Sequence, residues 1–180
     1  MKSSMDAFLP IYQFSERHAC GVACKASRIL DAVTCYRPET DPFFRGVIAL
    51  RELPARFWRE RPETFGFHNF TLLDRTENEI VYGLAGQFWK ANYGLYPVAD
   101  SRAFQLFEQP EVAKLVLGFS VQHKADGLCL LATETRVFCP DQASRLKFTP
   151  YWLLIRPVSG LIRRRILSAI KKASEAPMSG

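Results

Sequence analysis

The chain has 180 residues, a formal net charge of +6 and an apolar content of 48%, values that are typical of a globular domain. No run of about 18 apolar residues is present, so we expect no transmembrane helix. The first residues also lack the apolar run of a signal peptide, and we therefore expect a single domain over residues 1–180, located in the cytoplasm.

The first third of the chain predicts one strand followed by two helices. Residues 17–26 form the expected strand, and a short helix follows over residues 27–33 with Ser27 as its cap. The second helix is expected to begin at Thr40 or Asp41, with Pro42 in the first turn. We expect Pro54 to end this helix, because proline removes a backbone hydrogen bond and clashes with the preceding turn.

The middle of the chain changes to strand patterns. Two apolar runs surround the sequence DRTEN at residues 74–78, which predicts a hairpin. Residues 101–109 predict a short helix or an irregular crossover. Residues 112–123 and 128–139 then flank the sequence KADG, whose Asp-Gly pair predicts a second hairpin. Strands and helices that are segregated in this order predict an α+β fold, with helices on one face of an antiparallel sheet.

A long helix is expected to begin near Pro140 and Asp141 and to end before a frayed tail at residues 174–180. Pro157 predicts a kink or a break in this helix, while the small residues Ser159 and Gly160 leave room beside the sheet. Apolar residues recur at steps of three and four and predict the core-facing side: Phe148, Tyr151, Trp152, Ile155, Val158, Ile162, Ile166, Ala169, Ile170 and Ala173.

The positive charge is concentrated in this last segment. From Arg145 onward the chain carries eight Lys and Arg residues and one acid, Glu175, whereas the remainder has a net charge of −1. We expect Arg156, Arg163, Arg164, Lys171 and Lys172 to face solvent. A basic, amphipathic helix also suits a membrane surface, but the same isoleucines cannot both fill the core and lie in lipid. Nucleic-acid binding is disfavoured because the rest of the chain is nearly neutral.

The cysteines form an odd set without C-x-x-C spacing. We interpret them as free, buried or half-buried thiols rather than as disulfides or metal ligands: Cys20, Cys24, Cys35, Cys129 and Cys139.

Four segments carry a resemblance to a known family: TLLDRTENEIVYGLAGQFW, AKLVLGFSV, LATETRVFCPDQASRLKFTPYW and SGLIRRRILSAIKK. Together with the order of elements, they resemble small bacterial members of the START-like (SRPBCC) superfamily over about residues 12–174. The resemblance implies a helix-grip fold, in which a curved antiparallel sheet wraps around a long C-terminal helix and two short helices follow the first strand. It also implies a cavity between sheet and helix for an apolar small molecule, although members of the superfamily differ widely in function.

Aromatic residues, together with the small residues near Pro157, predict such a cavity with a volume of at least ~300 Å³. They also suit a closed core, so this alternative stays open. The residues that we expect to line the cavity are Phe70, Tyr82, Phe88, Trp89, Phe119, Thr133, Thr135, Tyr151, Trp152, Ile155 and Ser159.

The strand ATETRV at residues 132–137 carries polar residues on both faces. Its neighbours Leu131 and Val137 favour an inward direction for Thr133 and Thr135. Glu134 and Arg136 then form an exposed pair of little energetic value. The alternative places Glu134 and Arg136 in the cavity as acid-base or anchoring groups.

Neither a metal nor an organic cofactor is expected. The three histidines, His18, His68 and His123, lie isolated on different predicted strands, and no nucleophile-base motif is present. We therefore predict a protein that binds an apolar or aromatic small molecule or a lipid, without nucleic acid and without stable membrane insertion. The alternatives are a cofactor-free enzyme similar to the polyketide cyclases and dehydratases, or an interaction protein that forms a homodimer and binds no ligand.

Overall fold

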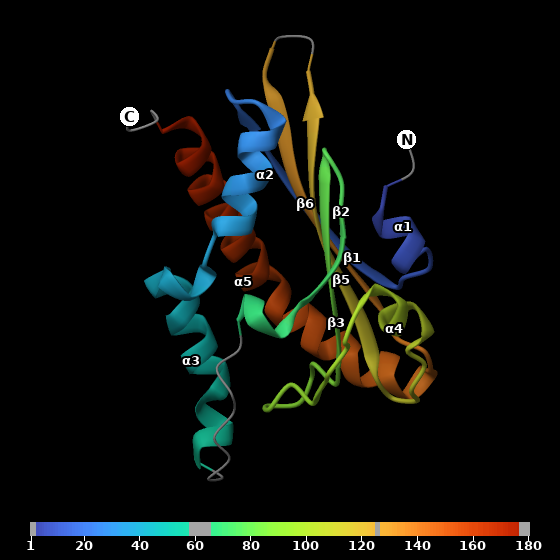
Figure 1. The fold of residues 1–180 in the computed structure, drawn as a ribbon. Helices are drawn as coiled ribbons and strands as arrows, with labels where there is room; N and C mark the ends of the chain where they lie inside the picture. Colours follow the sequence, from blue (N-terminus) through green and yellow to red (C-terminus); the bar gives the residue numbers. More distant parts are fainter. Residues whose placement is uncertain (1–2, 58–65, 125–126, 177–180) are drawn as a thin grey trace.

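An antiparallel sheet of six strands forms the centre of the protein (Figure 1). The computed structural model describes residues 3–57, 66–124 and 127–176. The strands pair in the order β1-β6-β5-β3-β2, with β4 beside β3, so β1 and β2 are edge strands. Their bounds are β1 (Phe14–Val22), β2 (Thr71–Arg75), β3 (Glu79–Gly86), β4 (Leu95–Tyr96), β5 (Ala113–His123) and β6 (Cys129–Phe138).

Helices lie on both faces of this sheet. The long helix α5 crosses one face, with α2 and α3 beside it, while α1 and α4 lie against the other face (Figure 1). The helical elements are α1 (Met5–Phe8), α2 (Ala26–Cys35), α3 (Pro42–Phe57), α4 (Ser101–Leu106) and α5 (Gln142–Glu175), with short 3-10 turns η1 (Pro38–Thr40) and η2 (Phe67–Asn69).

The predicted α+β class is confirmed: a curved antiparallel sheet packs against a long C-terminal helix, and α2 and α3 follow the first strand. Both predicted hairpins are present, because β2 pairs with β3 and β5 pairs with β6. Residues 125 and 126 of the KADG turn lie outside the described residues. The short helix predicted within residues 101–109 is α4.

Two predictions about helix ends are wrong, at Pro54 and at Ser27, and of the kink or break expected at Pro157 the break is absent. Helix α3 continues through Pro54, and α5 runs unbroken through Pro157. Figure 1 shows α5 bending along its length rather than dividing in two. Packing on both sides of Pro157 offsets the lost hydrogen bond, since the core contains Trp152 before it and Ile166 after it. Ser27 lies inside α2, whose N-cap is Lys25 without a side-chain hydrogen bond.

Strand β1 differs from its prediction in a way that matters for function. It spans Phe14–Val22 instead of residues 17–26, so Cys24 lies beyond the strand. Alternate residues of β1 face α5, beginning with Phe14 and ending with Val22, and this direction includes Glu16 and His18. All five cysteines are free thiols; Cys129 and Cys139 are buried, and Cys35 is exposed.

Two apolar clusters join the sheet to its helices on the α5 face. One packs α2 and the end of α5 on the sheet and includes Ile29, Leu131 and Ile170. The other surrounds the start of α5 and includes Phe88 and Trp152. A third cluster lies on the opposite face and contains Met5, Leu73, Val81, Phe104 and Val116. Coverage of the second face by α1 and α4 was not expected from the sequence.

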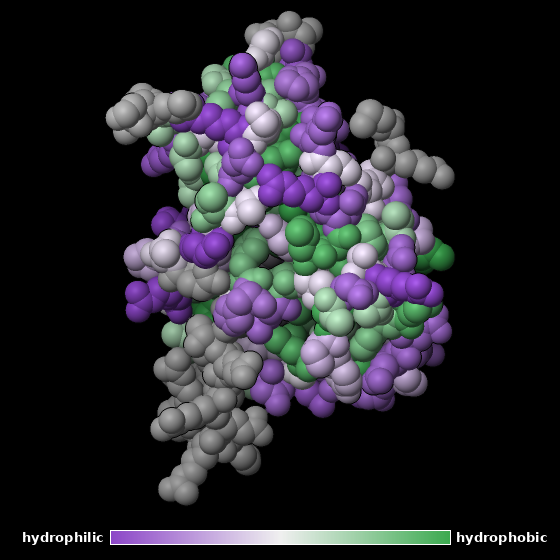
Figure 2. Space-filling model, in the orientation of Figure 1, coloured by the Kyte–Doolittle hydropathy of each residue, from purple (hydrophilic) through white to green (hydrophobic). Residues whose placement is uncertain are grey.

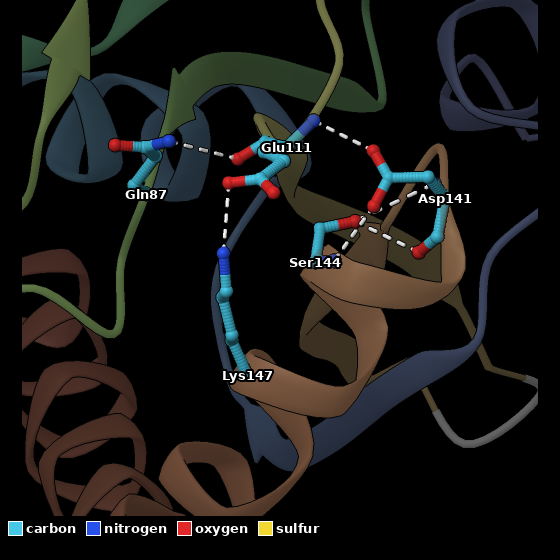
Figure 3. A network of polar contacts seen from close by, with 5 residues as sticks. All are labelled: Gln87, Glu111, Asp141, Ser144 and Lys147. Atoms are coloured by element: carbon cyan, nitrogen blue, oxygen red, sulfur yellow. Dashed lines mark hydrogen bonds and ion pairs between the residues drawn. The ribbon is translucent and has the colours of Figure 1, made fainter.

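The start of α5 is held by a polar network (Figure 3). The Asp141 carboxylate accepts hydrogen bonds from the backbone N–H of Ser144, at 2.7 Å, and of Glu111, at 2.6 Å. Glu111 also bonds with Lys147 and Gln87, which ties the helix to the loop before β5. The predicted helix start at Asp141 is confirmed, because Asp141 is the N-cap.

This cap predicts a dependence of stability on pH. The hydrogen bond from the Ser144 N–H, followed by that from Glu111, lowers the pKa of Asp141 below its usual value of 3.8. A lowered folded-state pKa stabilises the fold above pH 3.8 and ceases to do so as the pH falls through the folded value. We expect Asp141→Asn to lose less stability than the wild type between pH 7 and pH 3, measured by urea denaturation.

The control for this experiment is Asp31→Asn, which changes an exposed carboxylate paired with Arg75. The comparison separates the removal of an exposed carboxylate from the removal of the cap. Equal slopes for Asp141→Asn and the wild type would contradict the proposed contribution of the cap.

Candidate functional site

A groove with a volume of about 660 Å³ opens between edge strand β1 and the middle of α5. It lies between the sheet and the last helix, where the sequence predicts a cavity, but charged and polar residues make up most of its lining. These lining residues are Ser15, Glu16, Arg17, His18, Arg156, Pro157, Gly160, Leu161 and Arg164.

Glu16 and His18 reach from β1 toward α5. Glu16 Oε1 lies 2.7 Å from His18 Nε2, and the Glu16 side chain is only 8% exposed. Gly160 permits this arrangement, because a Cβ atom at residue 160 would lie 2.9 Å from Glu16 Oε1 and 3.5 Å from His18 Nε2. The small residue that was expected to leave room beside the sheet therefore accommodates a carboxylate and an imidazole.

Arg163 faces the same carboxylate from α5, contrary to the solvent-facing position expected from the sequence. Its Nε atom lies 3.8 Å from Glu16 Oε2, and its side chain is 13% exposed. Burial lowers the pKa of Arg163, an effect that Glu16 partly offsets. The reason is geometric: over 34 residues, the face of α5 that meets the twisted sheet moves around the helix, so that Val158 becomes exposed while Arg163 turns inward.

Thr133 and Thr135 complete this polar group from strand β6. They are buried and lie directly across from His18 and Glu16 in the β1–β6 pairing, with neighbouring side chains on one face of the sheet. Among the described residues, neither hydroxyl has a hydrogen-bond partner, and the same is true of Glu16 Oε2 and Arg163 Nε. We refer to Glu16, His18, Thr133, Thr135 and Arg163 as the Glu16 cluster.

Three predicted cavity residues are buried in the apolar clusters on the α5 face. Phe119 is fully buried in the cluster beside α2, whereas Phe88 and Trp152 pack with Phe148 at the start of α5. Aromatic side chains in a strand or helix pattern fill a core as readily as they line a pocket, so their place in a cavity stays a prediction.

Six other predicted residues are half-buried, and four of them, Phe70, Tyr82, Trp89 and Tyr151, pack against the core clusters on the α5 face. Phe70 and Leu115 pack against both clusters, and Tyr82 packs edge-on against Phe67. Burial raises the pKa of Tyr82. Figure 2 shows hydrophobic side chains gathered around a hollow near the middle of one face of the molecule. The six residues are Phe70, Tyr82, Trp89, Tyr151, Ile155 and Ser159.

Glu134 and Arg136 lie on the opposite face of the sheet, so the alternative that placed them in the cavity is wrong. Arg136 donates hydrogen bonds to Glu134 and to Asp6 of α1, and its guanidinium lies 4.7 Å from the ring centre of Tyr12. The Arg136 side chain is nearly buried rather than exposed. This interaction holds the N-terminal segment against the sheet.

The most polar part of the site was missed at the sequence level. Glu16 and His18 alternate with exposed residues in β1 and share their direction with Phe14, Cys20 and Val22. This alternation with a period of two residues is the sequence pattern that indicates an inward direction for Glu16 and His18. It was overlooked because the strand was expected to begin only at Arg17, which left Glu16 outside it and His18 without an acidic neighbour.

A second groove of about 830 Å³ lies beside the start of α2 and the β2–β3 hairpin, and His123 is part of its lining. Within the described residues, no three His, Cys, Asp or Glu side chains gather closely enough to hold a metal ion. No helix in the same residues is both long and apolar enough to cross a membrane.

Comparisons with known proteins leave the family open. No protein-family model and no curated protein matches the chain. A similar solved structure is that of a hypothetical protein from Helicobacter pylori, with 7% sequence identity and a TM-score of 0.40, covering 97% of this chain and 96% of that one. The function of the present chain therefore has to be argued from its own residues.

Proposed function

We propose that the protein binds a small amphipathic organic molecule between the sheet and α5. Its polar group would contact the Glu16 cluster, and its apolar or aromatic part would lie among the half-buried residues that pack against the core clusters. The proposed START-like resemblance of the sequence agrees with a ligand in this position.

The polar atoms of the Glu16 cluster are the main support for this proposal. Buried polar atoms in folded proteins are nearly always hydrogen-bonded, to protein, ligand or water. Here two hydroxyls, a carboxylate oxygen and a guanidinium nitrogen lack such a partner among the described residues and occupy adjacent positions. A ligand group that both donates and accepts hydrogen bonds would satisfy them, and the groove opens to solvent beside two members of the cluster, Glu16 and His18.

The basic rim of the groove favours a ligand with negative charge. Arg17, Arg156 and Arg164 line it, whereas its acid, Glu16, already faces His18 and Arg163. The amphiphiles that we expect to bind therefore carry a carboxylate, sulfonate or phosphate next to an apolar body.

Filling the proposed ligand space from α5 tests this proposal. Ser159→Phe places a ring on the half-buried side of the helix, and we expect it to weaken binding of 1-anilinonaphthalene-8-sulfonate and of oleate at least about tenfold, because the ring occupies the ligand's space. Fluorescence titration measures the first probe, and native mass spectrometry measures the second.

Ser168→Phe is the matched control, because Ser168 is exposed on the same helix. This variant should bind both probes like the wild type. Equal affinities for all three proteins, or no binding of either probe to the wild type, would contradict a ligand site between the sheet and α5.

A cofactor-free enzyme is the second candidate, and the contact of 2.7 Å between Glu16 and His18 favours it. A carboxylate that orients an imidazole is a common arrangement for proton transfer. Mass spectrometry of ligands extracted from the wild type and from Glu16→Gln separates the two functions. A carrier yields the same compound from both proteins. An enzyme yields a precursor from Glu16→Gln, and the wild type converts this precursor when it is added.

A further inference from the structure

Helix α5 has a second row of apolar residues that the core does not use. Leu146, Leu153, Leu154, Val158 and Leu161 are all exposed, from 38% at Val158 to 77% at Leu154. Their spacing places them on one side of the helix, together with Pro150 and Pro157. This outer row is opposite the buried row that contains Phe148, Trp152, Ile166 and Ile170.

The outer row changes the conclusion drawn from the sequence. A membrane-surface helix was disfavoured there because its isoleucines were needed in the core. The structure shows that different residues fill the two roles: the inward side chains pack on the sheet, and the leucines of the outer row stay in solvent. Contiguous exposed apolar residues mark interaction surfaces in soluble proteins.

The charge around the outer row identifies its partner. Arg156 and Arg164 lie within or just after this stretch, are exposed, and form no ion pair or hydrogen bond with another residue of the described chain. Other basic residues of α5 already face acids within the protein, Lys147 with Glu111, Arg163 with Glu16 and Arg165 with Asp41. Residues 142–174 contain no acid, so a second copy docked through the same face of α5 would not neutralise Arg156 and Arg164, whereas anionic lipid headgroups would.

We propose that the outer row of α5 docks on the surface of an anionic lipid bilayer. Leucines then enter the boundary between headgroups and acyl chains while the arginines contact phosphate groups, as in other interfacial helices. Arg156, Pro157, Leu161 and Arg164 also line the groove between β1 and α5, so its mouth would open at the lipid surface. The docking does not depend on the proposed ligand.

Cosedimentation with vesicles tests this surface. The full-length protein should bind vesicles of phosphatidylcholine mixed with phosphatidylglycerol, bind vesicles of phosphatidylcholine alone much less, and dissociate as salt is added. We expect Leu153→Ser combined with Leu154→Ser to lower the partition coefficient at least about tenfold. Arg156→Gln and Arg164→Gln should each lower it roughly fivefold.

Leu106→Ser is the matched control, because Leu106 is equally exposed but lies on α4, on the other face of the sheet. It should bind vesicles like the wild type, and so should Ser159→Phe, which separates this surface from the ligand site. Thermal melting verifies that each variant is folded.

Two results would contradict the proposal that the outer row docks on a lipid bilayer. One is equal vesicle binding by the wild type and the Leu153→Ser, Leu154→Ser variant, or no binding by either. The other is a wild-type dimer in light scattering that this double variant dissociates, because the outer row would then be covered by a second copy.

Discussion

Replacing Glu16 by alanine is expected to lower the free energy of unfolding by about 3 kcal/mol, near the lower end of the range for breaking a buried ion pair. Glu16 is 8% exposed and faces both His18, at 2.7 Å, and Arg163, at 3.8 Å. Its removal leaves the Arg163 guanidinium in a desolvated position without its negative partner. Urea denaturation of the wild type and the variant measures the difference.

A double-mutant cycle separates this interaction from the loss of packing. Arg163→Met keeps most of the apolar stem of the side chain and removes the charge. The double variant Glu16→Ala, Arg163→Met should be more stable than the sum of the single changes predicts, because neither charge is then left unpaired. Strictly additive effects would show that the two side chains do not interact across the groove.

Replacing Ile170 by aspartate is expected to lower the free energy of unfolding by at least about 4 kcal/mol, since it removes a buried side chain and buries an unpaired charge. Ile170 is 1% exposed and packs in the cluster shared by α2, α5 and the sheet. A typical domain is stable by only roughly 5–15 kcal/mol, so the variant should lose a large share of its stability and unfold at a much lower urea concentration. Circular dichroism and urea denaturation provide the measurement.

Leu154→Asp is the control on the same helix. Leu154 is 77% exposed, and the same type of change there should alter stability by no more than about 0.5 kcal/mol. If the two variants melted alike, the packing of the inward row of α5 on the sheet would be wrong.

Local patterns predicted the architecture because each one depends on neighbouring residues. The two hairpins follow from apolar runs around short polar turns, and the start of α5 follows from the capping ability of Asp141. The same reasoning failed at Pro54, where it predicted the end of a helix, and at Pro157 the break that it allowed from the local cost of proline is absent. In α5, packing along the sheet outweighs that cost over a long helix.

The candidate site was only partly predictable. The inward direction of Thr133 and Thr135 follows from strand alternation and agrees with the structure. Phe88, Phe119 and Trp152 were expected in a cavity and are buried in the apolar clusters, which does not test that expectation. A composition rich in aromatics does not distinguish the two environments, because both favour the same side chains.

The sequence by itself determined the α+β class, the order and pairing of the hairpins and the amphipathic character of the last helix, because these depend on period, turn chemistry and capping. Only the tertiary structure decided that Glu16, His18 and Arg163 meet. They come from β1 and from α5, nearly 150 positions apart in the chain, and both the edge position of β1 and the rotation of α5 on the sheet bring them together. The rotation also decides which leucines stay exposed, since a helix on a twisted sheet turns different sides inward along its length.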